Sequence, residues 1–173
     1  QIAFYQALTG NRLFHARHNH VQPIAAVAWS SKGLMHVVSA GADQRAIVWD
    51  PANYQALLTY RMHHAAITAA SWSSDGRTVA TSSSGGVIHV WDTTNGQDLH
   101  GIYQDGHGPL RALAFAPIGS LLAAGGDDGI VRIWNGLTCT LNGTQCQDQP
   151  QRLTTTKTAV RALAWSPDAR FLL

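Results

Sequence analysis

The chain has 173 residues, and only 13% of them are charged, about half of the share usual in globular domains. It has no glutamate and only two lysines, Lys32 and Lys157, so it lacks the residues that build solvent-exposed helix faces. No apolar run approaches the roughly 20 residues of a membrane span. The net charge of +2 and the scattered arginines argue against nucleic acid as the main ligand.

Taken in chain order, the sequence begins with a short predicted strand at 2–6 (IAFYQ) and then repeats itself. One motif recurs at intervals of 43, 43 and 50 residues, as 24–33 (IAAVAWSSKG), 67–76 (ITAASWSSDG), 110–119 (LRALAFAPIG) and 160–169 (VRALAWSPDA). A second motif lies between these, as 46–50 (AIVWD), 87–92 (VIHVWD) and 130–135 (IVRIWN). Tyr5 belongs to the second series, because it stands 44 residues before Trp49.

Each repeat is predicted to form four strands, which we name a to d in chain order. Strand a ends at the aromatic residue of the first motif, and its small apolar residues indicate burial on both faces. Strand b follows a turn rich in Ser, Pro, Asp and Gly, and strand c ends at the Trp of the second motif. Strand d is more polar, as in 56–60 (ALLTY). No segment indicates a helix.

Four-stranded units at this period, with Trp-Asp pairs at Trp49-Asp50 and Trp91-Asp92, resemble the WD40-repeat family. The resemblance covers almost the whole chain, and it implies an all-β β-propeller of four-stranded antiparallel blades. The implied divisions are strands c and d of a partial blade at 1–18, full blades at 19–61, 62–104 and 105–155, and strands a and b of a partial blade at 156–173. An insertion at 136–150 separates strands c and d of the third full blade.

The phase of the repeats predicts only part of a ring, because the chain starts in strand c and stops in strand b. We expect a partial propeller, or a fragment of one with about seven blades. Two alternatives stay open. The two ends could form a composite fourth blade and close a four-bladed ring, or two chains could pair into a larger ring.

The resemblance also implies a hydrogen-bonded network in each blade, made of a His, a Ser or Thr, an Asp and the Trp of strand c. A buried indole N–H needs an acceptor, which a hydroxyl supplies. In this sequence Gly85 takes the Asp place of the second unit, Ala124 takes the hydroxyl place of the third, and Thr156 takes the His place of the fourth. The predicted network residues are His20, Ser39, Asp43 and Trp49, then His63, Thr81 and Trp91, then His107, Asp128 and Trp134.

The resemblance points to a non-catalytic scaffold that binds a protein or peptide on the face formed by the d-to-a and b-to-c loops. Arg111 and Arg161 hold equivalent places in adjacent units, where they could pair with a partner's carboxylates. Alternatively, Arg111 pairs with Asp127. The candidate partner contacts are Pro109, Arg111, Asp127, Arg161, Thr68 and Ser84. A related alternative is a sensor or assembly module of a larger signalling protein.

The sequence offers little for catalysis or metal binding. The nine histidines form no zinc motif, and several have places in the predicted network. Asp127 and Asp128 could be paired catalytic carboxylates or Ca²⁺ ligands, but a turn between strands b and c explains them as well. A propeller-based enzyme is therefore the alternative that the sequence supports least. We predict no enzyme activity, no cofactor and no metal.

The only cysteines, Cys139 and Cys146, lie in the insertion, on either side of Asn142-Gly143. A disulfide between them would close a short hairpin on the face opposite the binding loops. Asn142 also begins an N-glycosylation pattern. We expect a cytoplasmic protein, and this loop keeps an extracellular location open.

Overall fold

The computed structural model describes residues 2–16, 20–30, 32–33, 35–103, 108–135, 150–154 and 158–173. Every named element within these ranges is a β-strand, so the prediction of an all-β fold is confirmed. In the same ranges, no helix has the length and apolar character needed to cross a membrane.

The strands form three four-stranded antiparallel sheets, each made from consecutive strands. The first sheet contains β3 (Ile24–Trp29), β4 (Val37–Gly41), β5 (Ala46–Asp50) and β6 (Gln55–Tyr60). The second contains β7 (Ile67–Trp72), β8 (Thr78–Ser83), β9 (Val87–Asp92) and β10 (Asp98–Tyr103). The third contains β11 (Leu110–Phe115), β12 (Leu121–Gly126), β13 (Ile130–Asn135) and β14 (Gln151–Thr154).

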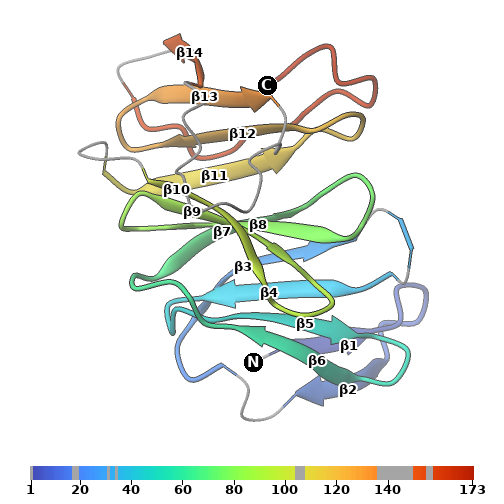
Figure 1. The fold of residues 1–173 in the computed structure, drawn as a ribbon. Helices are drawn as coiled ribbons and strands as arrows, with labels where there is room; N and C mark the ends of the chain where they lie inside the picture. The colour runs from blue at the N-terminus through green and yellow to red at the C-terminus, as the bar shows by residue number, and fades with distance from the viewer. Residues whose placement is uncertain are drawn as a thin grey trace.

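The sheets pack face to face in chain order, and the hydrophobic core lies between them (Figure 1). The first strands of the sheets, β3, β7 and β11, are neighbours across these interfaces. Small residues fill the space between the sheets together with the large side chains of strand c. The packed residues include Val38, Val48, Ile67 and Trp91 between the first two sheets and Val90, Leu110 and Leu122 between the second and third.

Tryptophans of strand a also join neighbouring sheets by hydrogen bonds. Trp72 Nε1 donates to the carbonyl oxygen of Ala28 in the preceding sheet at 3.0 Å. Trp165 Nε1 donates in the same way to the carbonyl oxygen of Ala114 at 3.0 Å. Phe115 has no indole N–H, and its backbone N–H donates to Ser71 Oγ instead. The aromatic series of the sequence is therefore a series of contacts between sheets.

The Trp72→Phe variant is expected to lower the free energy of unfolding by about 1–2 kcal/mol, because it removes one buried hydrogen bond and some packed volume. Urea denaturation followed by circular dichroism measures the change. An unchanged midpoint and slope would show that this indole bond contributes nothing to the packing of the first two sheets.

The prediction that every strand a is buried on both faces is wrong for β3. Its side chains alternate between half-buried and exposed, and Val27 and Trp29 are 57% and 54% exposed. The reason is the position of β3 in the stack, since no complete sheet precedes it within the described residues. The equivalent Trp72 of β7 packs against the first sheet and is only 6% exposed.

The two ends of the chain form incomplete sheets. At the N-terminal end, β1 (Ile2–Tyr5) pairs with β2 (Arg12–Ala16), and both pack on the first sheet through Ile2, Phe4 and Phe14. At the C-terminal end, residues 158–173 pack on the third sheet and turn back on themselves, with a bridge between Trp165 and Leu172. These ends lie at opposite extremes of the stack (Figure 1), so the described residues do not close a four-bladed ring.

Candidate binding face at the loop ends of the strands

In the first unit, the structure joins the four predicted network residues by hydrogen bonds. Trp49 Nε1 donates to Ser39 Oγ at 2.8 Å, and His20 Nε2 lies 2.8 Å from the same hydroxyl. On the other side of its ring, His20 Nδ1 lies 2.9 Å from both carboxylate oxygens of Asp43. The network thereby fixes the segment before β3 and the turn between β4 and β5 against each other.

Asp43 is the fixed charge of this network. Its side chain and that of His20 are each only 1% exposed. Burial by itself would raise the pKa of Asp43, but the His20 hydrogen bond and the N–H groups of Val21 and Arg45 outweigh it and lower that pKa. The carboxylate therefore stays ionised, and the stability that it contributes is lost only as the pH falls through its lowered pKa.

The second unit keeps the His, Thr and Trp but lacks the carboxylate. Trp91 Nε1 donates to Thr81 Oγ1 at 3.2 Å, and His63 Nε2 lies 2.8 Å from that oxygen. The buried Nδ1 of His63 has no hydrogen-bond partner within the described ranges, since Gly85 stands at the Asp place. Burial, and then the nearby His89, lower the pKa of His63 to about 3.

In the third unit, a buried ion pair joins Arg132 to Asp128. Arg132 is 0% exposed, and its Nη2 donates to Asp128 Oδ2 at 2.5 Å. Its Nη1 donates to the carbonyl oxygen of Ile130 at 3.3 Å. Trp134 is buried beside this pair on β13. His107, predicted for this unit, lies outside the described residues, as does Thr156 of the fourth unit.

Sequence reasoning missed Arg132 and His89, which occupy the same position of strand c, two residues before its Trp. In the sheet this position faces the hydroxyl place of strand b, as the pairs Thr81–His89 and Ala124–Arg132 show. The first unit has an apolar residue there, Ile47, opposite Ser39. The sequence feature that could have identified these two residues is a polar side chain inside an otherwise apolar strand. It occurs in the two units whose predicted network is incomplete.

The b-to-c turn and the start of strand a meet at one end of every sheet. In each unit the backbone N–H of the residue before the Asp place donates to the carbonyl of the residue before strand a. The three pairs are Ala42 to Pro23 at 2.9 Å, Ser84 to Ala66 at 2.9 Å and Asp127 to Pro109 at 3.0 Å. In the third unit, this approach requires glycine at Gly126, because a Cβ there would lie 2.2 Å from the Pro109 oxygen.

A one-residue irregularity at the start of strand a turns a side chain toward this end of each sheet. The register shifts lie between Ile24 and Ala26, between Ile67 and Ala69, and between Leu110 and Ala112. Such bulges commonly re-aim the extra residue. The extra residues are Ala25, Thr68 and Arg111, so two of the predicted partner contacts, Thr68 and Arg111, hold the same position in their sheets.

Arg111 and Asp127 form a bidentate ion pair on this face. Arg111 Nε and Nη2 donate to the two carboxylate oxygens of Asp127 at 2.9 and 2.8 Å, and both side chains remain more than a third exposed. The Arg111 hydrogen bonds lower the pKa of Asp127 although burial opposes them, and the charges of Arg111 and nearby Arg161 add to the effect. The pairing alternative for Arg111 is thus observed, while Arg161 stays exposed beside it.

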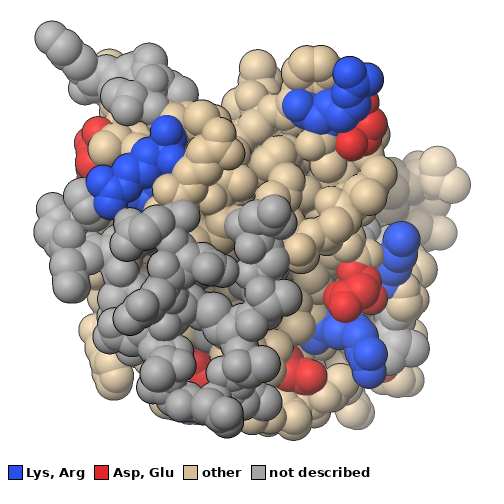
Figure 2. All heavy atoms as spheres, turned by 45° about the horizontal axis from the view of Figure 1, so that its top comes forward, with Lys and Arg blue, Asp and Glu red and all other residues tan. Residues whose placement is uncertain are grey.

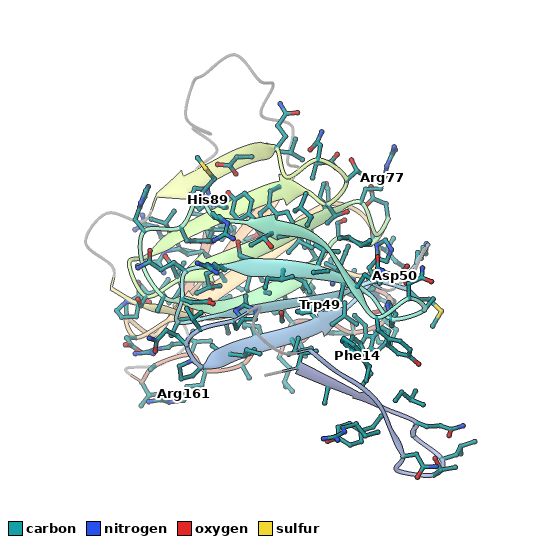
Figure 3. The ribbon with its side chains drawn as sticks, turned by 90° about the horizontal axis from the view of Figure 1, so that it is seen from below. Phe14, Trp49, Asp50, Arg77, His89 and Arg161 are labelled. Atoms are coloured by element: carbon teal, nitrogen blue, oxygen red, sulfur yellow. The ribbon has the colours of Figure 1, made fainter. Side chains whose placement is uncertain are left out.

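Arg161 lies at one end of the strands, and Asp50 and Arg77 lie at the other (Figure 3). Figure 2 shows that basic and acidic side chains gather in small mixed clusters on the face it displays, separated by uncharged residues.

The second unit presents fewer polar groups for a partner on the candidate binding face than the third unit does. Thr68 is half-buried, with its hydroxyl bonded to the carbonyl of Ser82, and Ser84 is half-buried with its N–H bonded to Ala66.

The described part of the chain contains no group of three His, Cys, Asp or Glu side chains arranged to hold a metal ion. Asp127 and Asp128 are engaged by different arginines, so the geometry does not present them as a carboxylate pair. Cys139 and Cys146 lie outside the described residues, and the disulfide stays a prediction.

Repeated four-stranded sheets, packed face to face with strand a next to strand a, define a protein of the β-propeller class. The family described as "WD domain, G-beta repeat" (WD40) matches residues 11–50, 54–92 and 99–135, together more than half of the chain. The chain therefore belongs to the WD40-repeat family, and the predicted resemblance is confirmed.

Several known proteins are similar to this chain. "WD repeat-containing protein srw1" of Schizosaccharomyces pombe is 31% identical over 86 residues, which are 48% of this chain and 15% of that protein. "Protein FIZZY-RELATED 3" of Arabidopsis thaliana is 30% identical over 86 residues, 48% of this chain and 18% of that protein. A chain of "Crystal Structure of Mitotic Checkpoint Complex" matches with a TM-score of 0.81 at 23% identity, covering 97% of this chain and 48% of that one.

These comparisons show a fold and a family rather than a partner. WD40 propellers are generally non-catalytic interaction scaffolds. A further relative, "B-type cell cycle switch protein ccs52B" of Medicago truncatula, is 29% identical over 86 residues, 48% of this chain and 18% of that protein, and its name describes a cell-cycle role rather than an enzyme. The chain spans less than a fifth of the length of the first two relatives and about half of the structural neighbour.

Proposed function

We propose that this chain is a non-catalytic protein-interaction module that binds an acidic segment of a partner protein at the Arg161 end of its sheets. The observation that carries this proposal is the arrangement of Arg111, Asp127 and Arg161 on one exposed surface. Asp127 already occupies both donors of the Arg111 fork, so Arg161 is the guanidinium left for a partner's carboxylate.

The surrounding structure supports this role. Arg111 and Asp127 stand on a bulge and a backbone pair that recur in all three sheets, and the segment that carries Arg161 is tied to the third sheet by the Val160 N–H, which donates to the carbonyl of Gly126 at 2.8 Å. Because the backbone of this surface is already ordered, binding costs only the rotamer freedom of the side chain, and the planar guanidinium matches the geometry of a carboxylate. The relative named as a cell cycle switch protein and the structural neighbour from the Mitotic Checkpoint Complex also favour a protein partner over a small-molecule substrate.

The test is a selection of peptides from a random display library, followed by titration calorimetry with the enriched sequences. We expect enriched peptides to carry Asp or Glu and the Arg161→Glu variant to bind them at least tenfold more weakly, about 1.4 kcal/mol. The matched control is Arg77→Glu, which makes the same charge change at the opposite end of the strands (Figure 3) and should leave affinity unchanged.

Circular dichroism of both variants separates binding from folding. Equal weakening by the two substitutions would show that only overall charge matters, and an Arg161→Glu variant that binds normally would exclude this surface. A longer source polypeptide carrying a kinase or nucleotide-binding motif would instead favour the assembly module of a signalling protein.

A further inference from the structure

The turn between β9 and β10 contains an asparagine that precedes a glycine, Asn95-Gly96. The turn lies beside Arg77, because the N–H and the hydroxyl of Thr93 both donate to the Arg77 carbonyl, at 3.0 and 2.9 Å. Figure 3 shows Arg77 at the end of the strands opposite Arg161, so this turn is remote from the candidate binding face. Its polar groups take no part in the predicted networks or in the proposed partner contacts.

An asparagine in such a turn can lose its side-chain amide to the protein's own backbone. The backbone nitrogen of the next residue attacks the side-chain carbonyl carbon, so that a C–N bond forms there while the bond to the side-chain nitrogen breaks. The proton of the attacking nitrogen passes to the leaving group, which departs as ammonia. Water then opens the resulting succinimide ring at one of its two carbonyls and leaves either an aspartate or an isoaspartate.

Three features of the turn favour this reaction at Asn95. Gly96 has a φ of +74° and carries no Cβ that would crowd the attacking nitrogen. The backbone N–H of Gln97 donates to Asn95 Oδ1 at 2.8 Å, which polarises the carbonyl under attack and stabilises the negative charge that its oxygen gains. Asn95 is also exposed, so water reaches the ring and ammonia leaves it.

The first sheet contains the same turn without the first two features. Asn53 stands three residues after Asp50, at the end of strand c, and it is exposed as Asn95 is. The next residue is Tyr54, which has a φ of +57° but carries a side chain beside the nitrogen that would attack. Asn53 Nδ2 also donates to Asp50 Oδ2 at 2.7 Å, and this bond holds the group that would have to leave. The two turns therefore differ in reactivity although they share one backbone shape.

One hydrogen bond of the turn opposes the attack. The Gly96 N–H donates to the carbonyl oxygen of Asp92 at 2.9 Å, so this nitrogen must leave its acceptor before it can reach the side chain of Asn95. The Asp92 N–H donates in turn to the carbonyl oxygen of Gln97 at 2.9 Å. Exposed turns open locally far more often than the sheet behind them. Local opening of this turn therefore sets the rate of the reaction.

We propose that Asn95 is a modification site at which the folded protein forms isoaspartate through this succinimide, and that the product destabilises the turn. Isoaspartate adds a methylene to the main chain between positions 95 and 96, inside a turn whose hydrogen bonds fit the ordinary backbone. Gly96 lies against Leu58 of β6, since a Cβ at Gly96 would be 3.2 Å from Leu58 Cδ1. Disturbing the turn therefore also disturbs the contact between the first two sheets.

The new carboxylate adds a second effect. Asp92 accepts hydrogen bonds from the hydroxyl and the N–H of Thr94. The hydroxyl bond above all lowers the pKa of Asp92, so its carboxylate is ionised at neutral pH. The product therefore places a further negative charge in a turn that already holds one, and like charges in one turn repel each other.

Ageing of the purified protein at mildly alkaline pH tests the site, because loss of the amide proton speeds the attack. Tryptic peptides 78–111 and 46–61 contain one asparagine each, Asn95 and Asn53, so mass spectrometry follows the two conversions separately. We expect conversion at Asn95 to be faster than at Asn53 by a factor of about ten or more, which is about 1.4 kcal/mol or more in activation free energy. Electron-transfer fragmentation identifies isoaspartate, and circular dichroism establishes that the protein stays folded.

Two variants separate the effects of the product, in chains with Asn135→Gln and Asn142→Gln, which remove the other asparagines that precede glycine. Asn95→Asp adds the carboxylate and keeps the ordinary main chain. Asn95→Gln, whose longer side chain disfavours the ring, should show no conversion in peptide 78–111. We expect the aged protein to unfold at a lower urea concentration than Asn95→Asp. Conversion at Asn95 no faster than at Asn53, or an aged protein as stable as Asn95→Asp, would overturn the proposal.

Discussion

The Asp128→Ala variant is expected to lose about 3–5 kcal/mol of the free energy of unfolding, the range for breaking a buried ion pair from one side. The substitution leaves the guanidinium of Arg132, which is 0% exposed, without its carboxylate. Among the described residues, the acceptor that remains is the carbonyl of Ile130, and Arg132 Nε has no hydrogen-bond partner there. Urea denaturation at pH 7 measures the loss.

A second substitution distinguishes the buried charge from other consequences of losing Asp128. Arg132→Ile places at this position the apolar type that Ile47 supplies in the first unit, opposite Ala124. Combined with Asp128→Ala, it should recover most of the lost stability, because no unpaired charge remains buried. A double variant no more stable than the single one would contradict this account and point to the turn itself.

Acid is expected to destabilise the protein through His63. The pKa of this imidazole is about 3 in the folded protein, because burial disfavours the charged form, while its ordinary value is 6.5. Between these values the unfolded chain binds a proton that the folded chain does not. Stability is therefore lost as the pH falls from about 6.5 toward 3, with a limiting slope of about 1.4 kcal/mol per pH unit from this residue.

The Gly85→Asp variant should reduce this acid sensitivity, because it restores the carboxylate that His20 has in the first unit. A Cβ at Gly85 would lie 3.2 Å from the Cβ of Ala65, a tight contact that requires Ala65 to shift by a few tenths of an ångström, and no positive φ opposes a side chain there. Hydrogen bonding to His63 Nδ1 would stabilise the fold by about 1 kcal/mol at pH 7 and by about 2–3 kcal/mol at pH 5, where the imidazolium also gains a partner.

Unfolding curves across this pH range, with an NMR titration of the His63 ring, check the expectation. Gly85→Ala is the control, since it adds the Cβ without the carboxylate and should keep the wild-type dependence on pH. If Gly85→Asp and Gly85→Ala behave alike, the missing carboxylate is not the cause of the lowered pKa.

Some of the residues in these predictions could be identified from the sequence, and others could not. His20, Ser39, Asp43 and Trp49 could be proposed in advance, because a repeated pattern fixes their offsets along the chain. Arg132 could not be proposed in advance, because an arginine in a strand is as compatible with an exposed side chain as with a buried one. Its burial depends on the packing of the third sheet against the second, which is set by residues far apart in the sequence.

The candidate binding face could likewise be predicted only in part from the sequence. The equivalence of Arg111 and Arg161 is visible from the repeat, but the pairing of Arg111 with Asp127 depends on a bulge that turns the side chain. The local sequence does not predict that bulge. It arises where strand a leaves the sheet and the backbone of Asp127 meets that of Pro109.

By itself, the sequence determined the strands, their grouping in fours and the aromatic positions, because tryptophan spacing and small apolar runs record local structure and burial directly. The tertiary structure decided how each unit compensates for an incomplete network and which strand faces are covered. Trp29 shows the difference, since it belongs to the same motif as Trp72 and yet is exposed. The burial of this side chain depends on a neighbouring sheet, and the repeat motif does not predict whether a sheet covers that face.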